Sequence, residues 1–76
     1  MIEQPKITRD LVIATYKYYM DIHGRTSCGV VANDLNRRGY VSPRGRIVSR
    51  MSVWRMMQET REGREAIQET RERVGK

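Results

Sequence analysis

Two short helical patterns joined by a turn-rich connector constrain most strongly how this chain can fold. Residues 27–38 carry apolar side chains at helical spacing and are followed by Gly39, a residue type that commonly ends helices. A second helical pattern covers residues 49–58, and both patterns begin at a serine, which favours a helix start. Residues 42–45 between them, Ser-Pro-Arg-Gly, have the composition of a β-turn. We therefore expect two consecutive helices joined by a tight connection.

The spacing of apolar residues predicts which side of each helix is buried. In the first helix the inward face is Cys28, Val31, Ala32 and Leu35, and we expect Cys28 to serve packing. The outward residues are expected to be Asn33, Asp34, Asn36 and Arg37. In the second helix the inward residues are Val53, Met56 and Met57. Trp54 fits either the edge of the core or the surface.

A longer helix is predicted for residues 8–23, with Thr8 as its cap and Gly24 as its stop. At 100° per residue its apolar arc covers roughly 260°, far more than an ordinary surface helix shows. Either this helix is the centre of the bundle, or part of it is buried against another subunit. The residues assigned to an oligomer or partner face are Tyr16, Tyr19, Met20 and Ile67.

The C-terminal segment, residues 59–76, differs in character from the predicted helix-turn-helix domain of residues 1–58. It repeats the sequence Gln-Glu-Thr-Arg-Glu, which begins at residue 58 and again at residue 68. Thr60 can cap a fourth helix there, but its apolar stripe is thin and needs a surface to lie on. That stripe is Ala66, Ile67, Thr70 and Val74. The segment is either a frayed, solvated end or a helix for a dimer or partner contact.

These patterns together predict an all-α fold, a helix-turn-helix domain of three to four helices. The residue pairs 40–41 and 47–48 on either side of the turn are β-prone. They favour a small wing-like β-hairpin between the second and third helices.

Positive charge is concentrated in the same part of the chain. Residues 24–55 contain seven arginines and one acid, so this segment alone accounts for the formal net charge of +6. With a pI of about 10.1, the chain is expected to bind a polyanion. The alternative is a basic surface that serves solubility only.

Several classes of function are disfavoured by the composition. Cys28 is the sole cysteine and His23 the sole histidine, so we expect no disulfide, structural zinc site, other metal, cofactor or catalytic pair. There is no apolar run of about 18 residues, and residues 1–6 lack the apolar region of a signal peptide. We therefore expect a cytoplasmic, non-enzymatic protein of one domain, in a bacterial cell or a phage-infected host, that does not bind membranes.

Residues 31–57 resemble the DNA-binding region of large serine recombinases, whose pattern includes A-x-x-L-N-x-x-G, a glycine-containing loop and W-S-x-x-[ST]-V-x-x-[IL]-L. The matching residues are Ala32, Leu35, Asn36, Gly39, Pro43, Gly45, Ser49, Ser52, Val53, Met56 and Met57, with Val48 where the family has Trp. Residues 23–35, H-G-R-T-S-x-x-x-V-A-x-x-L, are also similar to the winged helix-turn-helix of LexA-type repressors. Because 76 residues leave no room for a catalytic domain, the resemblance implies DNA binding and not recombination. It is typical of a small regulator from a phage or mobile element.

In such a motif the second helix enters the major groove of double-stranded DNA. The residues expected to contact bases are Arg50, Met51, Ser52 and Arg55. Those expected to contact the DNA backbone are Arg25, Arg37, Arg38, Arg44 and Arg46. A homodimer would extend the short site that one module can read. The alternative is a regulator that docks on a host transcription protein such as RNA polymerase.

Overall fold

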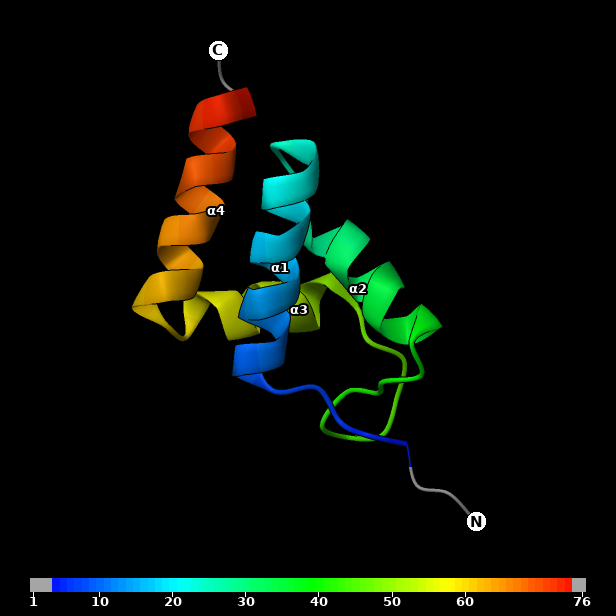
Figure 1. Cartoon of the computed structure of the whole chain (residues 1–76). Helices are drawn as coiled ribbons and strands as arrows, with labels where there is room; N and C mark the ends of the chain where they lie inside the picture. The colour runs from blue at the N-terminus through cyan, green and yellow to red at the C-terminus, as the bar shows by residue number, and fades with distance from the viewer. Residues whose placement is uncertain (1–3, 75–76) are drawn as a thin grey trace.

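Four helices make up the fold of residues 4–74, the part of the chain that this computed structural model describes. They are α1 (Arg9–His23), α2 (Cys28–Arg37), α3 (Arg50–Gln58) and α4 (Arg61–Val74). Figure 1 shows α1 at the centre, with α4 along one side, α2 on the other and α3 crossing behind. The predicted all-α fold of three to four helices is confirmed.

Hydroxyl side chains start the helices at the predicted positions. Thr8 and Thr60 each accept a hydrogen bond from the backbone amide three residues later, at 3.2 and 3.0 Å. Ser27 and Ser49 cap α2 and α3 in the same way, at 3.3 and 3.1 Å. Gly24 ends α1 in the left-handed conformation, with φ of 76°. Each of these boundaries follows from local chemistry, because a cap satisfies amides that have no partner within the helix.

One continuous core lies between α1 and the other three helices, all of which pack against it. Val12 of α1, Leu35 of α2 and Met57 of α3 meet there with no exposed surface. The complete set of buried hydrophobic residues is Ile7, Val12, Ile13, Tyr16, Met20, Val31, Ala32, Leu35, Val48, Val53, Met57, Ala66 and Ile67. The central position of α1 therefore explains part of its wide apolar arc.

Three residues assigned from the sequence to an oligomer or partner face belong to this core instead. Tyr16, Met20 and Ile67 are only 2%, 6% and 9% exposed, so their assignment to an exposed face is wrong. The physical reason is that α4 lies along α1 (Figure 1), so that Tyr16 and Met20 of α1 and Ile67 of α4 are buried between the two helices. The Tyr16 hydroxyl is within hydrogen-bond distance of Thr70 Oγ1 in α4, at 2.7 Å.

The C-terminal segment forms a packed helix rather than a frayed end. Ala66, Ile67 and Thr70 point into the core, as the thin apolar stripe predicts, while the side chain of Val74 lies outside what the structure describes. Gly63, in the first turn of α4, lies close to the end of α3. A Cβ atom at this position would lie 2.2 Å from the carbonyl oxygen of Met57. Glycine is therefore required for α4 to approach the end of α3.

The connector between α2 and α3 contains the predicted turn but not the expected hairpin. The Gly45 amide donates to the Ser42 carbonyl at 2.8 Å, and the Ser42 amide donates to the Arg46 carbonyl at 2.8 Å. Val41 pairs instead with the segment before α1: its amide donates to Pro5 and its carbonyl accepts from Ile7, both at 2.9 Å. Since these backbone groups are already satisfied, Val41 is not available to pair with residues 47–48.

We expect Gly63→Ala to lower the free energy of unfolding by about 1–3 kcal/mol, because the new methyl group overlaps the backbone of Met57. Gly29→Ala is the matched control, since its Cβ would meet only Ser27 Oγ at 3.7 Å. That change should be neutral or stabilise by up to about 1 kcal/mol, as helix propensity predicts. Urea unfolding followed by circular dichroism measures both. Equal effects of the two substitutions would contradict the close approach at Gly63.

Candidate nucleic-acid interface

The side chain of Asn36 fixes the connector to α2. Its Nδ2 donates to the Val48 carbonyl, and its Oδ1 accepts from the Val48 amide, both at 2.8 Å. Val48 is thereby turned inward, with 2% exposure, and Ser49 follows it directly as the cap of α3. The start of α3 is therefore held against the last turn of α2.

The outward face of α3 carries most of the residues predicted to contact bases. Met51 and Arg55 are exposed on the side opposite the buried Val53 and Met57, and Arg50 is exposed in the first turn. This geometry leaves three long side chains free to reach a ligand that lies along α3.

The structure shows the exposure and contacts of two further residues of α3, which helical spacing alone does not give. Ser52 is half-buried, and its hydroxyl is 3.2 Å from Ser49 Oγ, so it takes part in the cap. Trp54, which fits either the core edge or the surface, is 41% exposed. Trp54 thus adds an aromatic surface next to the outward face.

Most arginines of the charged segment have no carboxylate partner among the described residues. Arg38 is the exception: its Nε donates to Asp34 at 3.0 Å, and its guanidinium lies 6.0 Å from the centre of the Tyr40 ring. Within residues 24–55, the exposed arginines that form no ion pair with a described residue are Arg25, Arg37, Arg44, Arg46, Arg50 and Arg55. Their charge is available to an external anion.

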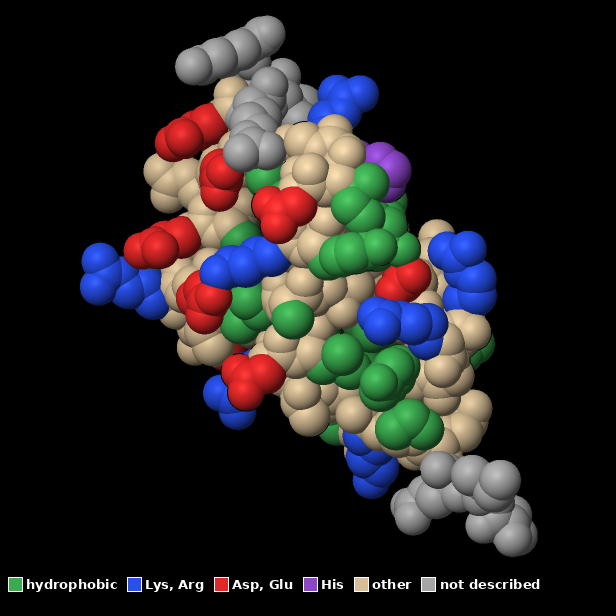
Figure 2. Space-filling view, viewed as in Figure 1, with side chains coloured by type: hydrophobic (Ala, Val, Ile, Leu, Met, Phe, Trp, Pro, Cys, Tyr) green, Lys and Arg blue, Asp and Glu red, His purple; other side chains and the backbone are tan. Residues whose placement is uncertain are grey.

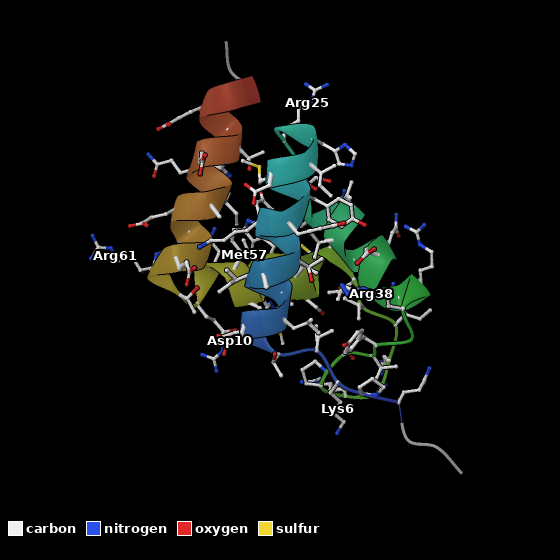
Figure 3. The ribbon with its side chains drawn as sticks, viewed as in Figure 1. Lys6, Asp10, Arg25, Arg38, Met57 and Arg61 are labelled. Atoms are coloured by element: carbon white, nitrogen blue, oxygen red, sulfur yellow. The ribbon has the colours of Figure 1, made fainter. Side chains whose placement is uncertain are left out.

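The fold brings the connector to the side of α3. Arg44 of the turn and Arg55 of α3 line one open hollow. Arg46 lines a neighbouring hollow with Asn36 and Ile47. Arg25 does not join this group: it follows the end of α1, whereas the connector pairs with the segment before α1 begins (Figure 3).

Acidic side chains gather elsewhere, over α4 and the adjoining edge of α1 (Figure 2). Several are paired with nearby cations. Glu62 contacts Lys17, Glu59 lies 3.5 Å from Arg9, and Arg61 donates to Glu65 at 3.0 Å. The molecule therefore has one side with paired charges and another with unpaired arginines.

Asp34 and Asn36 do not simply point outward, as their helical positions predict. Asp34 accepts a hydrogen bond from the Tyr19 hydroxyl at 2.6 Å as well as from Arg38. This bond to a carboxylate raises the pKa of Tyr19 and ties α1 to α2. Asn36 could have been found from the resemblance, which includes it as a matching residue, although helical periodicity alone places it at the surface.

Cys28 packs against the core, and the described residues contain no cluster of metal-ligand side chains. Burial raises the pKa of the Cys28 thiol, which makes it a poorer nucleophile and agrees with a packing role. No group of three or more His, Cys, Asp or Glu side chains within residues 4–74 is placed to hold a metal ion.

Comparisons with protein-family models, with curated proteins and with solved structures found no match. None of the helices described is both long enough and apolar enough to span a bilayer. The geometry and charge of the chain itself therefore carry the functional conclusion.

We expect Asn36→Ala to lower the free energy of unfolding by about 1–3 kcal/mol, because it leaves both backbone groups of Val48 without their partner. Asn33→Ala is the matched control, since Asn33 is exposed on the same helix, and its change should stay within about 0.5 kcal/mol. Urea unfolding of the two variants measures the difference. If Asn33→Ala lowers the free energy of unfolding as much as Asn36→Ala does, the two hydrogen bonds from Asn36 do not hold the connector.

Proposed function

We propose that this protein binds double-stranded DNA through α3 and the connector, and that it is a sequence-specific transcriptional regulator of a phage or mobile element. The observation that carries the proposal is the set of exposed, unpaired arginines on this one part of a helix-turn-helix arrangement. A polyanion supplies the partners that these side chains lack in the chain itself. The resemblance to recombinase and LexA-type DNA-binding regions supports the same conclusion.

The outward face of α3 suits the major groove. An α-helix with its side chains is about 10–12 Å across, and the major groove is about 12 Å wide. Arg50 and Arg55 are the proposed base readers, since arginine can donate two hydrogen bonds to O6 and N7 of guanine. Met51 would contact apolar base edges such as the thymine methyl group. Ser52 has a smaller role, because its hydroxyl is engaged at the cap.

The connector and the end of α2 would hold the DNA backbone. Arg44 and Arg46 extend from the turn beside α3, and Arg37 and Arg38 lie at the end of α2. Contacts to phosphates position the protein without reading sequence. Arg25 is left out of this surface because it lies at the other end of α1.

We expect binding to duplex DNA to weaken steeply with salt. If four to six arginines contact phosphates, the logarithm of the association constant should fall against the logarithm of salt concentration with a slope of roughly −3.5 to −5. Fluorescence anisotropy with a labelled duplex at several salt concentrations measures the slope. A flat dependence, or no binding at low salt, would refute the DNA-binding proposal and favour docking on a host transcription protein.

Substitutions should distinguish residues that contact bases, and so determine specificity, from residues that contact the DNA backbone. We expect Arg55→Ala to cost about 1–3 kcal/mol on the preferred site and much less on random DNA. Arg44→Ala should weaken both by similar factors and reduce the salt slope by about one unit. The site is first selected from a random duplex pool, and affinities are then compared.

Arg61→Ala is the control for these variants, because Arg61 is exposed on α4 and already pairs with Glu65. It removes the same charge but should leave DNA affinity nearly unchanged. If Arg44→Ala rather than Arg55→Ala abolishes the preference for the selected site, the connector reads the sequence and α3 does not.

A further inference from the structure

The connector carries the most exposed large hydrophobic side chain within residues 4–74. Ile47 is 80% exposed, whereas the other exposed large hydrophobic residues of this part of the chain are between 41% and 60% exposed. It follows Arg46 directly and precedes the buried Val48. An isoleucine in water contributes none of the stabilisation that its burial would give, so a partner that covered Ile47 would gain that burial.

Hydrogen bonds hold the backbone on both sides of Ile47. The buried Ser42 holds Arg46: its hydroxyl accepts from the Arg46 amide at 3.1 Å, and its amide donates to the Arg46 carbonyl at 2.8 Å. Asn36 holds Val48 through both the amide and the carbonyl, at 2.8 Å each. Ile47 thus lies between two residues whose backbone groups are engaged, and its side chain points outward from a fixed position. A contact made from such a position costs less conformational entropy than one made from a mobile loop.

Cationic side chains flank this apolar residue. Arg44 and Arg46 belong to the same connector, and neither forms an ion pair with a described residue. Lys6 lies beside the connector, since its segment pairs with Val41 through the backbone (Figure 3), and it is exposed and forms no ion pair within residues 4–74. A partner that covers Ile47 therefore has to bring negative charge around one apolar contact point.

Duplex DNA offers this combination in its major groove. Phosphates border the groove, and the C5-methyl of thymine is the apolar group that base edges present in it. The residues at the start of a recognition helix contact base edges, and Arg50 is the proposed reader in the first turn of α3. Because Ile47 precedes Arg50 by three residues, their Cα atoms are at most about 11 Å apart. That distance corresponds to about three base pairs at roughly 3.4 Å each.

We propose that Ile47 packs against the C5-methyl group of a thymine, within about three base pairs of the position read by Arg50. The inference rests on the proposed binding of α3 in the major groove. It makes the connector a second reader of sequence: Arg44 and Arg46 hold the neighbouring phosphates, while Ile47 adds a preference for thymine.

The contact is tested on the site selected from the random duplex pool, by replacing its thymines one at a time with deoxyuridine, which removes only the methyl group. The position read by Arg50 is the one at which Arg50→Ala loses its base preference. For the wild-type protein, one replacement near that position should weaken binding about three- to fivefold, as expected for the burial of one methyl group. Fluorescence anisotropy measures each affinity.

Ile47→Ala should remove the effect of that methyl group. The variant should bind the thymine and deoxyuridine forms of the site equally, and its affinity for the thymine form should fall by at least as much as the wild-type protein loses with deoxyuridine. Its affinity for random duplex should change less than about twofold. Ile22→Ala is the matched control, since Ile22 is 52% exposed at the end of α1 and should leave every affinity unchanged. Circular dichroism shows that both variants remain helical.

Two results would overturn the inference while leaving duplex binding intact. One is a wild-type protein for which no thymine near the Arg50 position has a methyl effect, or for which that effect persists in full in Ile47→Ala. The other is a uniform loss of affinity of Ile47→Ala for all duplexes, which would place Ile47 against the DNA backbone. Absence of duplex binding by the wild-type protein would instead refute the proposed function, and the contact at Ile47 with it.

Discussion

The two hydrogen bonds between Asn36 and the backbone of Val48 determine where the second half of the helix-turn-helix begins. The connector, residues 38–49, forms no strand of its own; its first half is held by the pairing of Val41 with the segment before α1 and by the turn at Ser42, and its last part by Asn36. By engaging both the amide and the carbonyl of Val48, Asn36 turns this residue into the core and places Ser49 at the start of α3. Together with the burial of Val53 and Met57 in the core, these two bonds set the direction of α3 and with it the positions of Arg50 and Arg55.

The two sides of the molecule differ in how their charges are paired. Over α1 and α4 three ion pairs form, Arg9–Glu59, Lys17–Glu62 and Arg61–Glu65, and such exposed pairs contribute little to stability. Around the connector and α3, arginines remain without carboxylates and repel each other. An arrangement that costs stability in the free protein is consistent with selection for an anionic partner, which is why DNA is the partner we propose.

The two faces of the central helix α1 differ in how far they are buried. Tyr16 and Met20 are buried against α4, whereas Tyr18 and Ile22 on the opposite side of α1 remain exposed. A chain of this size has a small core, so it cannot cover every apolar residue of a central helix.

The sequence by itself determined the features that arise within a few residues of the chain. Thr8, Ser27, Ser49 and Gly24 set helix ends through local hydrogen bonds and backbone conformation, and periodicity identified inward residues such as Leu35 and Val53. The four helices and the outward position of Arg55 followed from these signals.

Only the tertiary structure decided the features that depend on a neighbour distant in sequence. Helical spacing gives the direction of Tyr16 and Tyr18 around α1, but not which direction α4 will cover. Helix propensity predicts that Gly63 destabilises α4, although the nearby backbone of Met57 leaves no room for a Cβ atom at this position. Polarity places Asn36 at the surface, although it holds Val48, and β-propensity suggests a hairpin where Val41 pairs with the segment before α1. In each case the energy comes from a contact whose partner is chosen by packing, and a pattern along the chain carries no information about that choice.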